Sequence, residues 1–159
     1  MDERERFVRL YRSKVDHTLA FLRDVPDDCW AAVYGSQATV GQLANHLVTA
    51  ERFWFAQAGD PACGEMSAPP AAKARTRNAL ITTYEALLEE ATDTLVGLSE
   101  TRLHERVRFA GRRFTTLAFC WGVLAHHSFH LGQMDVIART FGVSAIAFQP
   151  WGPPDEFVG

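Results

Sequence analysis

Four long segments of this chain repeat apolar residues at the three- and four-residue spacing of an amphipathic helix. They cover roughly residues 2–24, 39–58, 74–98 and 116–141. A stripe at this spacing buries one side of a helix against its neighbours, and 159 residues are enough for one domain. The sequence therefore predicts an all-α fold, a four-helix bundle that occupies residues 1–159 as a single domain.

Capping and proline signals mark the ends of these helices. Thr39 and Gln42 form a capping-box pattern, in which each side chain accepts a hydrogen bond from the other's backbone N–H. Pro26 ends the first helix, because a proline disfavours the helical conformation for the residue before it. Three prolines lie between Gly59 and Ala72, so this stretch is predicted to be a long loop between the second and third helices.

Residues 105–114 carry a different pattern, in which polar and apolar residues alternate around Ala110 and Gly111. A period of two is typical of strands, and the central dipeptide is a turn signal. We predict a short hairpin or extended arm that crosses one end of the bundle. The last helix then begins at Thr115 or Thr116.

Charge and cysteine content narrow the classes of function. The net charge is −3 with acids and bases interspersed, so no basic patch indicates a nucleic-acid partner. No run of about 18 apolar residues suggests a membrane span, and residues 1–6 lack the apolar stretch of a signal peptide. Cys29, Cys63 and Cys120 are too far apart for a disulfide framework, so a cytoplasmic location is expected.

His126 and His130 lie four residues apart in the last helix, which places their Cβ atoms about 5–6 Å apart on one face. Phe119, Val123 and Met134 fall on the same side when each residue turns the helix by about 100°. The two histidines are therefore predicted to point into the bundle, where their imidazoles can share one metal ion.

His46 holds a similar position on the second helix, since Leu43 and Trp54 share its face. A lone buried histidine is more often a core residue that hydrogen-bonds to a backbone carbonyl or to water. Three inward-facing histidines, two of them at chelating spacing, instead favour a shared divalent metal ion. The predicted ligands are His46, His126 and His130.

Three further residues are candidates to support these ligands. Gln133 lies about one turn beyond His130 on the same face, and His127 lies about 100° from His126. His127 is also a candidate fourth ligand. Glu51 lies about 140° from His46, so it is predicted to be a solvated or interhelical charge that assists only if it reaches the site.

Two stretches of the sequence resemble the DinB/YfiT-like superfamily of metal-binding four-helix bundles. Val40-Gly-Gln-Leu-Ala-Asn-His46-Leu-Val-Thr-Ala-Glu51 is similar to the second helix of that superfamily, with its single histidine. His126-His-Ser-Phe-His130-Leu-Gly-Gln133 is similar to its His-x-x-x-His-Arg-Gly-Gln signature, except that Leu131 replaces the arginine. The resemblance implies that His46, His126 and His130 are metal ligands, that the metal is zinc or nickel, and that the protein is a homodimer.

Some members of this superfamily are thiol S-transferases, and the proposed ligand set is compatible with that chemistry. Three imidazoles leave one position of a tetrahedral zinc ion open, as in catalytic zinc sites. The residue after His126 is His127, so the His-Glu-x-x-His arrangement of zinc proteases is absent. Activation of a thiol needs no separate base, because coordination itself favours the thiolate.

The function predicted from these residues is that of a metal-dependent thiol S-transferase acting on a small molecule, with a low-molecular-weight thiol as partner. Arg108, Arg112 and Arg113 on the predicted hairpin are candidates to hold a charged thiol, although a solvated edge is their more usual role. Two alternatives stay open. One is a metal-dependent hydrolase or isomerase, and the other is a non-catalytic metal-binding stress-response module.

Overall fold

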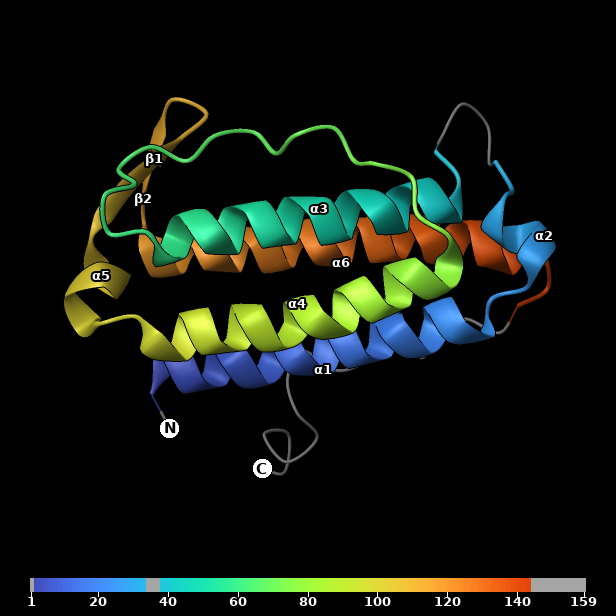
Figure 1. Ribbon diagram of the computed structural model, residues 1–159, viewed down its shortest axis with the longest axis horizontal. Helices are drawn as coiled ribbons and strands as arrows, with labels where there is room; N and C mark the ends of the chain where they lie inside the picture. Colours follow the sequence, from blue (N-terminus) through green and yellow to red (C-terminus); the bar gives the residue numbers. More distant parts are fainter. Residues whose placement is uncertain (1, 34–37, 144–159) are drawn as a thin grey trace.

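The computed structural model describes residues 2–33 and 38–143, and its four long helices lie side by side as a bundle (Figure 1). These are α1 (Glu3–Asp24), α3 (Val40–Gly59), α4 (Arg77–Gly97) and α6 (Thr116–Thr140). Helix α4 packs against both α1 and α3, and α6 packs mainly against α3. The predicted all-α four-helix bundle is therefore confirmed. None of the helices in the described residues is long and apolar enough to cross a membrane.

Side-chain caps fix where the long helices begin. The predicted capping box is present in α3, where Gln42 N donates to Thr39 Oγ1 at 3.1 Å and Thr39 N donates to Gln42 Oε1 at 2.8 Å. Helix α4 begins later than predicted, at Arg77, because the Thr76 hydroxyl accepts the Ala79 N–H and so ends the preceding extended segment. Thr115 is the cap of α6.

Two single-turn helices were not predicted. Helix α2 (Asp27–Trp30) follows Pro26, and helix α5 (Glu100–His104) starts with Ser99 as its cap. A helix of four or five residues shows no full repeat of the apolar stripe, so its periodicity cannot be distinguished from that of a loop.

The predicted hairpin is also confirmed. Strands β1 (Arg106–Phe109) and β2 (Arg112–Thr115) pair antiparallel and lie at one end of the bundle (Figure 1). Ala110 (φ 49°) and Gly111 (φ 75°) both adopt positive φ, as the tight turns that suit paired strands require. The long loop after α3 joins this hairpin, since Met66 N donates to Arg108 O at 2.7 Å.

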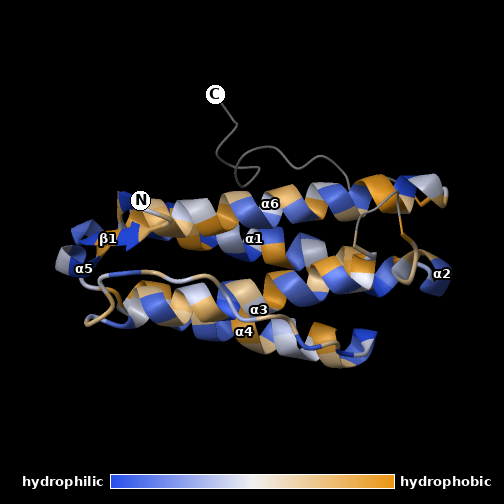
Figure 2. Ribbon diagram, turned by 90° about the horizontal axis from the view of Figure 1, so that it is seen from above, coloured by the Kyte–Doolittle hydropathy of each residue, from blue (hydrophilic) through white to orange (hydrophobic). Residues whose placement is uncertain are grey.

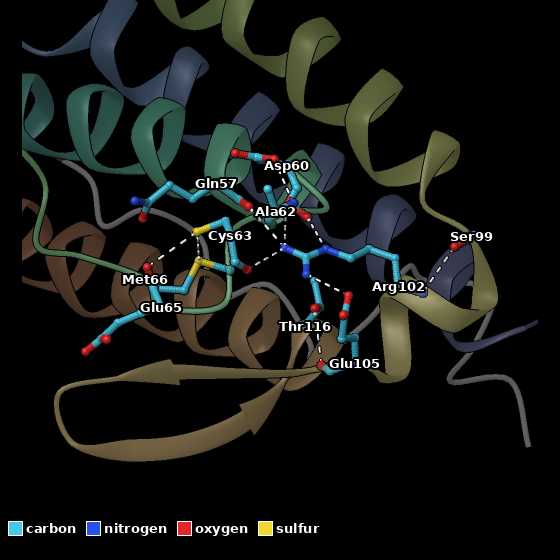
Figure 3. Close-up of polar contacts among 11 residues, drawn as sticks. Gln57, Asp60, Ala62, Cys63, Glu65, Met66, Ser99, Arg102, Glu105 and Thr116 are labelled. Carbon is cyan, nitrogen blue, oxygen red and sulfur yellow. Dashed lines mark hydrogen bonds and ion pairs between the residues drawn. The ribbon is translucent and has the colours of Figure 1, made fainter.

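Arg102 of α5 ties the end of α3 to the hairpin end of the bundle (Figure 3). Its guanidinium is buried and donates to four backbone carbonyls, those of Gln57, Ala58, Asp60 and Cys63. It also bonds to the Glu105 carboxylate at 2.8 Å. The guanidinium thus holds together carbonyl groups of the last turn of α3 and of the loop that follows it.

We expect Arg102→Ala to lower the free energy of unfolding by about 3 kcal/mol, because it removes a buried guanidinium that donates to four backbone carbonyls and pairs with Glu105. Arg139→Ala is the matched control, since its side chain is 58% exposed and pairs with Asp135 one turn away in the same helix. That surface change should cost less than about 1 kcal/mol. Urea denaturation of both variants measures the difference, and equal values would show that Arg102 has no such role.

Candidate metal centre

The structure brings His46 of α3 together with His126 and His130 of α6. The Nε2 atom of His126 lies 3.1 Å from Nε2 of His46 and 3.0 Å from Nε2 of His130. One ligand atom from each of the three residues lies within 4.8 Å of the others. The residues come from distant parts of the chain, and their nitrogens converge on one small volume.

These nitrogen positions fit a single divalent ion. Imidazole nitrogens bind zinc at about 2.0–2.1 Å, so two of them at tetrahedral or octahedral angles lie about 2.9–3.4 Å apart. The two Nε2–Nε2 distances fall in this range. A hydrogen bond between two imidazoles uses one proton and one lone pair, and His126 Nε2 cannot serve both neighbours in this way with a single proton. A shared ion would satisfy all three lone pairs, so this triad can hold a metal.

Gln133 fixes which nitrogen of His130 carries the proton. Its Oε1 lies 2.6 Å from Nδ1 of His130, so the Nδ1–H donates to the amide oxygen. The lone pair is then on Nε2, the atom that faces His126. The structure therefore places Gln133 beside the triad, where the sequence suggested a supporting role.

The surroundings of His126 and His130 favour neutral imidazoles at these two positions. Burial, followed by repulsion from the charge that His130, His46 and His127 would carry, lowers the pKa of His126 to about 4. Burial also lowers the pKa of His130, although the hydrogen bond to Gln133 opposes this shift. Because metals bind the unprotonated ring, both residues are ready to act as ligands at neutral pH.

The sequence predicted that the three histidines point into the centre of the bundle. The structure places them at its edge instead. His46, His126 and His130 are each only half-buried, while His127 and Glu51 are fully buried. On α3 the buried residues are centred on the side of Leu47 and Glu51, and His46 lies at the edge of that side. The three histidines therefore lie along the seam between α3 and α6.

Glu51 and His127 instead form a polar cluster inside the core. His127 Nδ1 lies 2.8 Å from Glu51 Oε1, and His127 Nε2 lies 2.8 Å from the Thr18 hydroxyl. Tyr11 donates to Glu51 at 2.9 Å and Tyr84 donates to it at 3.0 Å. One side chain from each of α1 and α4 thus reaches this carboxylate, and Glu51 is an interhelical charge without solvent exposure.

The cluster also corrects the prediction for His127. Both of its ring nitrogens already have partners, so neither is free to be a fourth metal ligand. Burial and the neighbouring Glu51 charge raise the pKa of Tyr11 and Tyr84 well above the usual value, so both hydroxyls keep their protons and donate. The sequence did not identify either tyrosine as a candidate, because a tyrosine on the apolar side of a helix is usually explained by packing alone.

Trp54 also contacts the candidate site, although the sequence predicted only that it shares the face of His46. Its ring lies edge-on to the His126 ring, with centroids 4.9 Å apart. It also contacts Phe109 of the hairpin and Phe119 of α6, and its indole N–H donates to Ser67 O in the long loop at 3.0 Å. Trp54 therefore connects the loop and the hairpin to a proposed metal ligand.

The hairpin arginines do not belong to the histidine cluster in the described residues. Arg108 and Arg113 are cross-strand partners that are exposed on the hairpin, whereas Arg112 is the partner of Phe109, which contacts Trp54. Cys120 is fully buried, and burial raises the pKa of its thiol to about 12, so this thiol is a small apolar core group.

Solved structures with a similar fold include two DinB-like proteins and a mycothiol-dependent isomerase. A DinB-like protein from Bacillus subtilis aligns with a TM-score of 0.72 and 18% identity, over 93% of this chain and 98% of that one. A DinB-like protein from Bacillus cereus aligns with a TM-score of 0.67 and 20% identity, over 87% and 93%. A mutant of a mycothiol-dependent maleylpyruvate isomerase aligns with a TM-score of 0.65 and 16% identity, over 86% and 66%.

At these identities the structural matches establish the fold alone. No curated protein sequence matches the chain significantly. The sequence model of the DinB family, however, matches residues 1–153, which is nearly the whole chain. The chain belongs to the DinB family.

Proposed function

We propose that this protein is a metal-dependent enzyme that activates a low-molecular-weight thiol and transfers its sulfur to a small electrophilic molecule. The observation that carries the proposal is the convergence of the three histidine nitrogens at a half-buried position. Three neutral ligands leave a tetrahedral site open at a fourth position. Zinc and nickel both suit imidazole ligands, and we expect one of them at this site.

The residues of the chain have distinct roles in this proposal. His46, His126 and His130 hold the ion through Nε2, and Gln133 keeps the His130 proton on Nδ1. Trp54 packs against the His126 ring and excludes water from that side. A divalent ion held there lowers the pKa of a thiol, so that the thiolate is present at neutral pH.

Thiol transfer is favoured over hydrolysis because the seam lacks an available base. Glu51 is bonded to Tyr11, Tyr84 and His127 inside the core, and no carboxylate in the described residues joins the histidine cluster. Hydrolysis by a metal centre usually relies on such a base beside the attacking water. A thiolate is already the nucleophile, so thiol transfer needs no group of this kind.

A thiol-dependent isomerisation is the second candidate. The observation in its favour is the structural likeness to a mycothiol-dependent maleylpyruvate isomerase. Both candidates use the same thiol activation and differ in whether the sulfur stays on the product. The lack of a disulfide framework supports a reducing, cytoplasmic location, in which low-molecular-weight thiols are available.

The test is turnover of chlorodinitrobenzene with a panel of thiols: cysteine, glutathione, mycothiol and bacillithiol. The thiolate sulfur forms a bond to the aromatic carbon, chloride leaves with the bonding electrons, and the thiol proton passes to the buffer. We expect zinc- or nickel-loaded protein to accelerate the reaction with at least one thiol, and His130→Ala to abolish the acceleration. His104→Ala is the control, because His104 is 67% exposed and lies on α5. Absence of turnover with every thiol would refute the transferase proposal.

A further inference from the structure

The hairpin carries several arginines whose side chains form no ion pair or hydrogen bond within the described residues. They are all exposed, and they are Arg106, Arg108, Arg112 and Arg113. Several arginines of the long helices instead pair with carboxylates, as Arg12 does with Glu89 at 2.7 Å. The hairpin lies at one end of the bundle beside α5, where hydrophilic segments appear in blue (Figure 2). Its unpaired guanidinium groups are available to an anion from outside the chain.

Arg112 differs from the other three in the face of the hairpin on which it lies. Successive side chains of a strand point to opposite faces, and directly opposed residues share a face. The inner face holds Val107, which is fully buried, and Phe109, whose ring contacts Trp54. Arg112 is the cross-strand partner of Phe109 and shares the inner face, whereas Arg106 lies on the outer face. Among the residues of the two strands, Arg112 is the only charged one on the inner face.

Ring contacts join this inner face to the candidate metal centre. The Trp54 ring lies edge-on to the Phe109 ring, with centroids 5.9 Å apart, and edge-on to the His126 ring, with centroids 4.9 Å apart. One indole therefore separates Phe109 from a proposed metal ligand. The Cβ atoms of directly opposed residues lie about 4.5–5.5 Å apart, so the Arg112 side chain begins next to Phe109. A molecule that reacts at the triad and extends over these two rings reaches the Arg112 guanidinium with its other end.

We propose that Arg112 binds a carboxylate of the thiol substrate, so that the protein selects a carboxylate-bearing peptide thiol over a neutral thiol. A guanidinium holds a carboxylate through two parallel hydrogen bonds. An extended tripeptide spans on the order of 10 Å, which is enough to pass over an indole and a phenyl ring. The sequence grouped Arg112 with Arg108 and Arg113, and the strand register separates it from both. This inference rests on the proposed function, which supplies the position of the reacting sulfur.

Isothermal titration calorimetry of the metal-loaded protein with S-methylglutathione tests the binding step without a reaction. This thioether keeps the carboxylates of the peptide but cannot form a thiolate. We expect Arg112→Ala to weaken its binding about 10-fold or more, because a charge-assisted hydrogen bond is lost. Arg112→Lys should lie between the wild-type protein and Arg112→Ala, since an ammonium group keeps the charge but not the paired geometry.

Arg106→Ala is the matched control for the binding experiment. It removes the same charge from the same hairpin, but from the outer face, where the side chain is exposed. Salt screens charges that do not contact the ligand, so this variant should change the Kd less than about twofold. Thermal unfolding and metal content of each variant show whether the fold and the triad are intact.

Turnover of chlorodinitrobenzene then shows which reactant carries the carboxylate. With glutathione, Arg112→Ala should raise KM about 10-fold and leave kcat nearly unchanged, because the thiol is activated at the triad and not at Arg112. With 2-mercaptoethanol, which has no carboxylate, the variant and the wild-type protein should have equal KM values. A difference in KM that appears only with a carboxylate-bearing electrophile, such as chloronitrobenzoate, would overturn the assignment to the thiol.

The calorimetry separates a failure of this inference from a failure of the proposed function. Equal Kd values for Arg112→Ala and Arg106→Ala, or no binding of S-methylglutathione, would overturn the role of Arg112 even if the protein turns over thiols. Binding that depends on Arg112, with no turnover of any thiol, would support the carboxylate site and count against the proposed transferase.

Discussion

Replacing His46, His126 or His130 with alanine is expected to lower the metal affinity of the protein more than about 100-fold. Loss of a residue that merely supports a ligand typically costs 10- to 100-fold, so loss of a ligand itself should cost more. Each histidine supplies one of the three nitrogens that converge in the seam between α3 and α6. With only two nitrogens left, an ion gains too little to replace its hydration shell.

The measurement is metal content by inductively coupled plasma mass spectrometry, on protein purified without a histidine tag. Competition titration with a chromophoric chelator then gives the affinity. His104→Ala should retain the metal, because this exposed histidine lies outside the cluster. The metal affinity of Gln133→Ala should lie between that of the ligand variants and that of His104→Ala. We expect a loss of about 10- to 100-fold, since only the orientation of His130 changes. Unchanged metal content in all three ligand variants would show that the site is misassigned.

Glu51→Ala is expected to lower the free energy of unfolding by about 3–5 kcal/mol, because it removes one partner from a buried, hydrogen-bonded cluster. His127 and the hydroxyls of Tyr11 and Tyr84 would lose their shared acceptor in a region without solvent. For a chain of this size that loss corresponds to a decrease in Tm of roughly 6–20 °C.

Glu90→Ala is the matched control for this variant. The Glu90 carboxylate pairs with Arg52 at 2.7 Å, but the Glu90 side chain is 55% exposed. Its loss should cost less than about 1 kcal/mol, since water replaces the interaction. Differential scanning calorimetry of the metal-free proteins separates this effect from metal binding. Similar Tm values for the two variants would mean that the buried cluster contributes no more than a surface ion pair.

Much of the fold could be predicted because its signals are local. The capping box of Thr39 and Gln42, and the turn at Ala110 and Gly111, involve atoms a few residues apart, so the sequence order nearly determines the geometry. The single turns α2 and α5 were missed because they are shorter than one repeat of the apolar stripe. The prolines in Gln149-Pro-Trp-Gly-Pro-Pro154 predict a tail that is not helical, and this segment lies outside the described residues.

The sequence predicted which three histidines form the candidate site, but it did not predict the residues around them. The spacing of His126 and His130 and the position of His46 led to the three residues that the structure brings together; that they bind a metal stays a prediction. The buried partners of Glu51 were missed because Tyr11 and Tyr84 lie 40 and 33 residues away from it along the chain. No pattern within one helix records such contacts.

The sequence by itself determined the number of long helices, most of their ends, the hairpin and the chelating pair on one helix. Only the tertiary structure decided which side of α3 and α6 faces the core. Both helices are apolar over more than half of their circumference, so burial of several different faces would remove similar areas from water. The choice depends on the cluster of Glu51, His127, Tyr11 and Tyr84, because these polar groups can be buried only together. That requirement turns the three histidines toward the seam between α3 and α6, where each is half-buried and not enclosed in the core.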